Sequence, residues 1–386
     1  MKLNEYREII EKYKKEYELK LEKNKKEYIE CMHNYNKESF INIMLNHQKI
    51  IKELIFEIIS EFDEFKNNDC CIMINGSLAR GTNTLYSDID INYFYNNEKF
   101  DSMINIEESV NYILQSIMNY RGKDRIHSMV VYLPLIRNNN YEPIKNNKYP
   151  IYFEDGIIYN SCRENAEKLM YETYNSTRDI NDLVNYLNSN DNDKKLNEWA
   201  NCFELIYDNN LYEEFVNKRK ICKDKNNIQN LIINVLTSIK KDNNYIENTN
   251  KEIKIKELKL FYKMLVLDNA YKVLSIYFRL NKEIQTINIK EFEERNIGLP
   301  EEFYDGFYKY LNLIQKLQYI LDKKNMDLSF HSKKSILKND LNNIYINSFN
   351  KSCIIDDLNN MKYEFYEKCK NILEKEVKKN EKFRNT

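Results

Sequence analysis

Apolar and charged residues alternate through the first 66 residues at the spacing of an α-helix. The apolar members of the first stripe are Tyr6, Ile9, Ile10, Tyr13 and Tyr17. A second apolar stripe runs from Ile41 to Ile58, again among Lys and Glu. Stripes at this period are packing faces of amphipathic helices. The pattern therefore predicts helices throughout residues 1–66.

The pattern changes at residue 70, where short apolar runs replace the helical stripes. The run Cys70–Ile74 favours a β-strand and stops at Asn75-Gly76-Ser77. A second strand is predicted from Asp88 to Tyr95. The next predicted elements are a helix at 104–120 and strands at 128–135 and 149–158. Strands and one helix in close succession indicate a compact α/β unit within a helical chain.

From residue 161 onward the pattern is helical again. The clearest predicted helices are 193–208, 226–240, 251–282, 301–322, 334–347 and 354–380. The chain of 386 residues is long enough for several domains. We therefore predict an α+β fold with three parts: an N-terminal helical region at 1–66, a mixed-sheet core at 67–165 and a C-terminal helical domain at 166–386.

The charge balance argues against one class of partner. Charged residues make up 31% of the chain, yet the formal net charge is only −1. A protein that binds nucleic acid mainly through phosphates needs a basic excess. The sequence thus carries no strong nucleic-acid signal, although a local basic groove is compatible with it.

Cysteine usage and hydropathy bear on the compartment. The eight cysteines form no C-x-x-C pair and the four histidines are scattered, which argues against a structural zinc site. No apolar signal segment follows Met1, and there is no run of about 18 apolar residues. We expect a cytoplasmic protein without a membrane segment.

The candidate chemistry lies between Ile74 and Ile91. Gly76 and Ser77 follow a predicted strand and start a predicted helix, where backbone N–H groups and a hydroxyl can meet phosphate oxygens. Asp88 and Asp90 are two residues apart on a predicted strand, so both carboxylates point to one face. Mg²⁺ binds carboxylate and phosphate oxygens together. The residues alone indicate a site for a divalent metal and a triphosphate.

The string Gly76-Ser77-x-x-Arg80-Gly81-x(6)-Asp88-Ile89-Asp90 resembles the DNA polymerase beta-like nucleotidyltransferase superfamily. It is most similar to the protein-PII uridylyltransferases and the related signal-transduction nucleotidyltransferases, over about residues 45–175. The resemblance implies a nucleotidyltransferase core in which Asp88 and Asp90 bind Mg²⁺ or Mn²⁺. It also implies that an NTP such as ATP is bound by Gly76, Ser77, Arg80 and Gly81. The expected reaction transfers NMP to a hydroxyl acceptor, and a protein side chain is the first candidate for it.

The same resemblance implies a third catalytic and metal-binding carboxylate on a later strand. Glu154, in the apolar run Ile151–Tyr159, is similar to that acid in its position. Asp155 is the alternative, but Asp155-Gly156 is also a turn signal. We expect residues 149–153 to form a strand beside that of Asp88 and Asp90, with Glu154 facing the cleft.

Two other functions stay open at this point. Gly76, Ser77, Gly81 and Thr82 also fit the Gly-Ser-x-x-x-Gly-Thr pattern of cGAS-like cyclic-oligonucleotide synthases, whose third acid precedes a proline. The segment from Met129 to Pro134 holds no acid. The second alternative is a non-catalytic protein that senses a nucleotide and binds a partner through its charged helices. The third carboxylate discriminates between catalysis and sensing.

Overall fold

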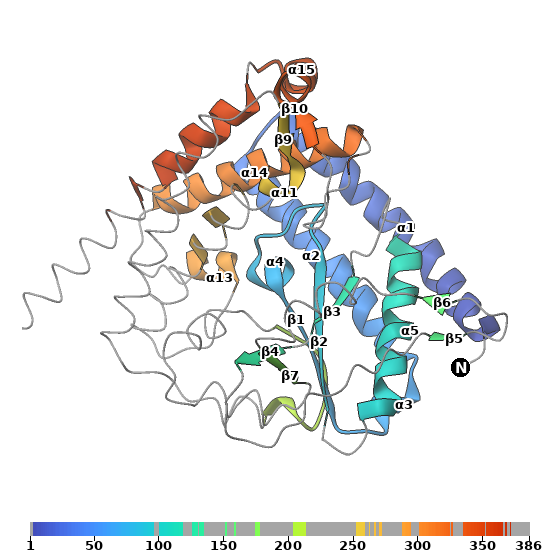
Figure 1. The fold of residues 1–386 in the computed structure, drawn as a ribbon. Helices are drawn as coiled ribbons and strands as arrows, with labels where there is room; N and C mark the ends of the chain where they lie inside the picture. The colour runs from blue at the N-terminus through green and yellow to red at the C-terminus, as the bar shows by residue number, and fades with distance from the viewer. Residues whose placement is uncertain are drawn as a thin grey trace, which may run out of the picture. The chain divides into compact units, whose positions relative to one another are not determined.

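The computed structural model describes the chain in segments (Figure 1). The described residues are 3–95, 100–118, 126–129, 131–134, 151–152, 158–159, 174–177, 204–213, 252–258, 262, 266–267, 270–271, 288–294, 301–324, 326, 335–351, 353–365, 367–368 and 371. They are mainly helical and include several small sheets, so the predicted α+β class is confirmed.

Contacts within the chain define two compact units. Unit 1 comprises Met1–Lys25, Asn46–Ala79 and Ser87–Cys222, and unit 2 comprises Lys26–Leu45, Arg80–Tyr86 and Lys223–Thr386. The three-part division at 1–66, 67–165 and 166–386 stays a prediction.

Three helices account for the N-terminal region, as its two apolar stripes predict. They are α1 (Leu3–His33), α2 (Lys37–Ser60) and α3 (Asp63–Lys66). The chain turns between α1 and α2 at Asn36, whose Oδ1 accepts a hydrogen bond of 2.9 Å from the backbone N–H of Ser39. An asparagine in this position satisfies an otherwise unpaired N–H of the first helical turn.

A four-stranded mixed sheet forms the centre of unit 1. Its order is β3-β2-β1-β8, with β1 at Cys70–Asn75, β2 at Ile89–Tyr95, β3 at Ile126–Met129 and β8 at Glu204–Asn209. The strand β1 is antiparallel to β2 and to β8, whereas β2 and β3 are parallel. The predicted mixed sheet is therefore confirmed.

One face of this sheet is covered by helices of unit 1. Tyr93 of β2 stacks on Phe65 of α3 at 6.2 Å between ring centroids, and its hydroxyl donates a 3.4 Å hydrogen bond to Asn111. Asn111 belongs to α5 (Phe100–Met118), the helix predicted at 104–120. Tyr207 of β8 contacts Phe56 of α2 at 6.2 Å. Tyr93 and Tyr207 both pair with Ile72 in register, so they mark the same face.

Two predicted elements of unit 1 differ in the structure. Residues 204–208 fall in a predicted helix but form the edge strand β8, because Leu205, Ile206 and Tyr207 suit a strand as well as a helix. The strand predicted at 128–135 is divided between β3 and β4 (Val131–Pro134), because β3 pairs with β2 whereas β4 pairs with β7 (Tyr174–Thr177).

Unit 2 is built around the long amphipathic helix α14 (Glu301–Lys323), which confirms the helix predicted at 301–322. It packs against α15 (Lys338–Phe349), and residues 354–365 are also helical. Phe365 fixes this packing, because its ring lies 5.1 Å from that of Phe303 and stacks on that of Tyr310. These aromatic contacts form the core of unit 2.

Two predicted helices of unit 2 begin as strands instead. Residues 252–254 form β9 (Glu252–Lys254), which is followed by α11 (Ile255–Leu258). Residues 335–337 form β10 (Ser335–Leu337), which pairs with β9 in antiparallel register. Each strand is three residues long, which is too short for a period to be read from the sequence.

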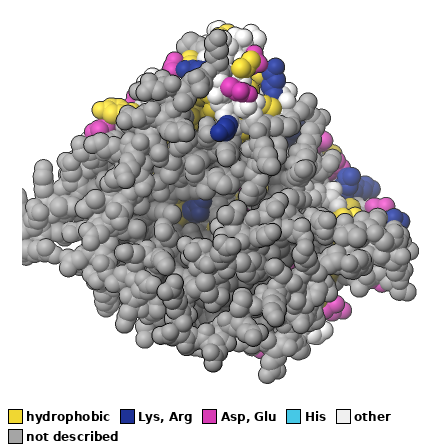
Figure 2. All heavy atoms as spheres, viewed as in Figure 1, with side chains coloured by type: hydrophobic (Ala, Val, Ile, Leu, Met, Phe, Trp, Pro, Cys, Tyr) yellow, Lys and Arg dark blue, Asp and Glu magenta, His cyan; other side chains and the backbone are white. Residues whose placement is uncertain are grey.

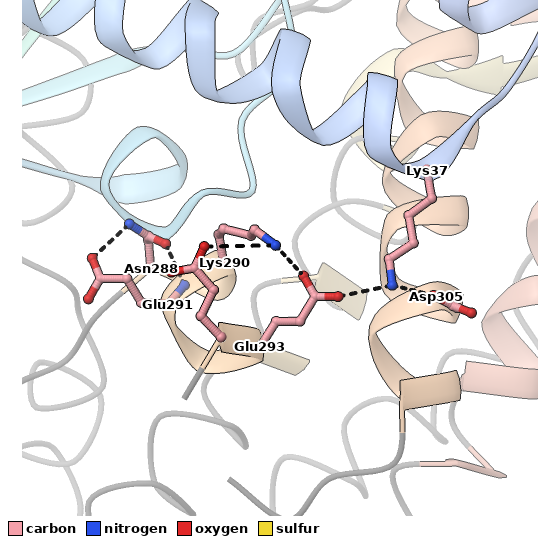
Figure 3. Close-up of polar contacts among 7 residues, drawn as sticks. Lys37, Asn288, Lys290, Glu291, Glu293 and Asp305 are labelled. Atoms are coloured by element: carbon pink, nitrogen blue, oxygen red, sulfur yellow. Dashed lines mark hydrogen bonds and ion pairs between the residues drawn. The ribbon is translucent and has the colours of Figure 1, made fainter. Parts of the chain in front are cut away.

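Lys37 links three helices of unit 2 (Figure 3). Its Nζ lies 2.9 Å from Glu293 of α13 (Ile289–Glu294) and 2.5 Å from Asp305 of α14. Asn288 caps α13, because its Oδ1 accepts a 3.0 Å bond from the N–H of Glu291 and its Nδ2 donates one of 3.1 Å to Glu291 Oε1. These contacts hold the start of α2, the short helix α13 and the first two turns of α14 in one cluster.

Candidate functional site

The end of β1 and the start of β2 bring Gly76 close to Asp90. Asn75 and Asp90 are register partners across the antiparallel pair. Gly76 comes next after Asn75, with φ of +66°, and begins the short helix α4 (Gly76–Arg80). The sequence predicts a strand that ends at this turn and leads into a helix. Glycine adopts the positive φ of this turn without strain.

The approach of these two residues is close enough to exclude a side chain at position 76. An ideal Cβ on Gly76 would stand 2.0 Å from Asp90 Oδ2 and 3.0 Å from Asp90 Cγ. The Asp90 carboxylate therefore occupies the space over the Gly76 backbone. Any group held by this carboxylate lies next to the turn that carries Ser77, which is itself buried.

Asp88 and Asp90 share one side of the chain at the start of β2. Ile89 and Ile91 are buried, whereas Asp88 and Asp90 are partly exposed. This alternation is the period of a strand, as the sequence predicts. The strand itself begins at Ile89, so Asp88 directly precedes it instead of lying within it.

Arg80 and Gly81 have their described contacts within unit 2. The guanidinium of Arg80 lies 5.7 Å from the ring centre of Tyr271, at the distance of a cation–π contact. Gly81 has φ of +73°, and a Cβ there would stand 3.0 Å from Ile289 Cγ2 at the start of α13. Gly76 and Gly81 therefore both have a positive φ and a close neighbouring side chain, and glycine suits both features.

The loop between Gly81 and Asp88 is held by two glutamines of α14. The hydroxyl of Thr84 hydrogen-bonds to Gln318 Oε1, and Gln315 Oε1 accepts a 3.0 Å bond from the backbone N–H of Leu85. Residues 82–86 are all buried. Sequence reasoning did not single out Gln315 and Gln318, because nothing local marks two glutamines more than 200 positions away as partners of this loop.

Both candidates for a third carboxylate, Glu154 and Asp155, lie outside the described residues. The strand expected there does not lie beside β2, whose partners are β1 and β3. Instead β5 (Ile151–Tyr152) pairs with β6 (Ile158–Tyr159). The expectation of a strand at 149–153 next to Asp90 is therefore wrong. A pairing partner a few residues away costs less chain entropy to reach than a distant strand.

Asp88 and Asp90 fit a divalent cation in donor type. Hard cations such as Mg²⁺ and Mn²⁺ bind carboxylate oxygens and retain sites for phosphate and water. The absence of a Cβ at Gly76 leaves the space that the Asp90 carboxylate fills. Within the part of the chain that the structure describes, no group of three His, Cys, Asp or Glu side chains could hold a metal ion.

The charged side chains visible on one face carry both signs. Figure 2 shows the described Lys and Arg side chains interspersed with Asp and Glu. This agrees with the balanced composition of the chain. Among the described residues, no helix is long and apolar enough to cross a membrane.

No protein-family model matches the chain, and no curated protein matches its sequence.

Proposed function

We propose that this chain is a nucleotidyltransferase that moves NMP from an NTP to a hydroxyl acceptor. The observation that carries the proposal is the contact between the Gly76 turn and the Asp90 carboxylate. Transfer of a nucleotidyl group requires that a triphosphate and a metal-binding acid meet at one point. A glycine turn directly beside a strand-borne acid supports such a meeting point, and so does the resemblance of residues 76–90 to the DNA polymerase beta-like superfamily.

Each residue of the string then has a role in the proposal. Asp88 and Asp90 hold Mg²⁺ or Mn²⁺, which when bound neutralises phosphate charge and lowers the pKa of a bound hydroxyl. Gly76 leaves the space that the Asp90 carboxylate fills, and Ser77 offers a hydroxyl to phosphate oxygens. Arg80 supplies a positive charge that phosphate oxygens favour. Gly81 permits the turn that leads into the loop before Asp88.

The contribution of the protein is mainly positioning and electrostatics. Transfer of NMP breaks the bond between the α- and β-phosphates and releases pyrophosphate. Negative charge develops on this leaving group, so fixed positive groups lower the barrier. Alignment of the acceptor hydroxyl with the α-phosphate supplies a further part of the rate. Glu154, or Asp155 in its place, is proposed to orient the acceptor as the third carboxylate.

The test is incubation of the full chain with each of the four α-³²P-labelled NTPs, Mg²⁺ or Mn²⁺, and a cell lysate as the acceptor source. Asp88→Asn and Asp90→Asn should each lower label transfer about a thousandfold, equivalent to roughly 4 kcal/mol of barrier. Both variants should keep the wild-type Tm. Asp63→Asn, at an exposed acid that pairs with Lys66, serves as the matched control and should transfer label normally.

The outcomes separate the candidate functions. Label transferred to a protein or to another acceptor supports the proposal. A product formed from NTP alone indicates a cyclic-oligonucleotide synthase that uses the same residues. Transfer that survives either aspartate substitution would contradict the metal role. Nucleotide binding without any product would favour a sensor.

A further inference from the structure

The second face of the central sheet carries a row of polar residues. Register pairs Asn75 with Asp90 and Met73 with Asn92, and paired residues of antiparallel strands share a face. Asn75, Asp90 and Asn92 therefore lie together on the face opposite the helix-covered one that Tyr93 marks. Asp90 has one asparagine directly across from it and a second one two positions further along its own strand.

Asn92 is buried without the hydrogen bonds that its side chain needs. It is 1% exposed, and neither its Oδ1 nor its Nδ2 has a hydrogen-bond partner within the described part of the chain. The Oδ1 of Asn75 is buried and lacks a partner in the same way. Buried polar atoms are nearly always paired, because an unpaired one destabilises the fold. Two such amides next to one acid, one across from it and one along its own strand, therefore require an explanation.

Asn111 of α5 shows how a buried asparagine in unit 1 is satisfied. It is 2% exposed, nearly the same as Asn92, but its Oδ1 accepts the hydrogen bond from the Tyr93 hydroxyl. Asn111 therefore finds a partner at the same degree of burial, whereas both side-chain polar atoms of Asn92 lack one within the described residues. An unpaired carboxamide beside the candidate metal ligand is a candidate contact for a bound molecule.

We propose that Asn92 binds the ribose of the nucleotide, a role that rests on the proposed function. A neutral carboxamide offers one acceptor and two donors, which match hydroxyl groups better than they match a phosphate or a metal ion. A strand rises about 3.3 Å per residue, so Asn92 lies roughly 7 Å along β2 from Asp90. This separation suits a sugar whose attached phosphate is held at Asp90. Asn75 extends the same polar surface on β1.

The experiment compares Asn92→Leu with the matched control Asn111→Leu in the full chain. Calorimetry with Mg²⁺ measures the dissociation constants of ATP, GTP, CTP, UTP and their 2′,3′-dideoxy analogues, and thermal unfolding without nucleotide measures the Tm. Asn92→Leu should weaken NTP binding about tenfold, which corresponds to one or two lost hydrogen bonds. It should abolish any preference for NTP over the dideoxy analogue. It should also raise the Tm, because an unpaired buried amide is removed.

Asn111→Leu should do the reverse, with a lower Tm and unchanged nucleotide affinity. Asn92→Ala tests the same contact without added volume, in case leucine does not fit. Asn92 variants with a lower Tm and wild-type affinity would overturn the inference and make Asn92 structural. Equal losses for NTP and dideoxy analogue would overturn the ribose assignment and indicate the base or the phosphates. If Asn92→Leu raised only the KM for the acceptor in the label-transfer assay, the ribose assignment would be overturned and Asn92 would contact the acceptor instead.

The two proposals fail in different ways. If the wild-type chain binds NTP but transfers no label, the transferase function fails while the ribose contact of Asn92 can still be measured. If the wild-type chain binds none of the four NTPs, both are wrong. In that case a raised Tm of Asn92→Leu would still show that the amide is unpaired in the unliganded protein.

Discussion

The Asp90 carboxylate lies directly over the backbone of Gly76. A methyl group at position 76 would stand 2.0 Å from Asp90 Oδ2, well inside the distance of any non-bonded contact. Asp90 is short and is anchored in β2, so its carboxylate would have to turn away. The position of the acid thus depends on the absence of a side chain at Gly76, the residue that follows Asn75, the register partner of Asp90.

Gly76→Ala should therefore damage the site more than the fold. We expect a loss of about 1–2 kcal/mol in unfolding free energy, from the φ of +66° that alanine disfavours. Label transfer should fall at least tenfold, because the displaced carboxylate no longer meets the turn. Urea unfolding and the transfer assay measure the two effects. Gly306→Ala is the control, since its Cβ would stand 3.4 Å from the flexible end of Lys368 and the helix α14 favours alanine.

The two glutamines of α14 should matter for the loop that leads to Asp88. Gln315→Leu leaves the buried N–H of Leu85 without an acceptor, and Gln318→Leu removes the partner of Thr84. Each change should lower the unfolding free energy by about 1–3 kcal/mol. Asn312→Leu on the same helix is the control, because the buried Oδ1 of Asn312 has no partner within the described residues. Equal stability of all three variants would contradict the role of the glutamines.

His47 of α2 should make the fold sensitive to acid. Burial lowers the pKa of this imidazole from 6.5 to about 4. Between these values the unfolded chain binds a proton that the folded chain does not, so stability falls as the pH falls from 6.5 to 4. The loss should approach roughly 3 kcal/mol at pH 4, and it vanishes above pH 7.

Chemical denaturation at a series of pH values checks this window. His47→Leu should flatten the pH dependence between 6.5 and 4, whatever its effect on stability at neutral pH. A slope that persists in His47→Leu would show that other groups cause the acid sensitivity.

The sequence predicts the centre of the fold better than its edges. β1 and β2 are recognisable because their apolar runs end in a glycine turn and an acid pair, which are local signals. β8 is not recognisable, since Leu205, Ile206 and Tyr207 become a strand only because β1 has a free edge for them. The pairing of β5 with β6, and not with β2, was equally unpredictable, because no local sequence pattern specifies which of several strands becomes the partner.

The candidate site divides in the same way. Gly76 and Asp90 could be identified from residue type and spacing, because both lie in one short segment of the sequence. The proposed role of Asn92 could not be predicted, since it rests on the missing hydrogen bonds of its side chain within the described residues and not on residue type. Gln315 could not either, because its partner Leu85 is distant in sequence. Long-range complementarity has to be seen in the structure.

The burial of residues 82–86 restricts how this chain can change over time. Loops at a protein surface commonly absorb inserted or deleted residues. This loop is enclosed, and Gln315 and Gln318 hold it at two successive residues, Leu85 and Thr84. An added residue would shift both contacts at once. It would also displace Asp88 from its position directly before β2. The number of residues between Gly81 and Asp88 is therefore expected to stay constant among descendants of this gene, even where the surface helices lengthen or shorten.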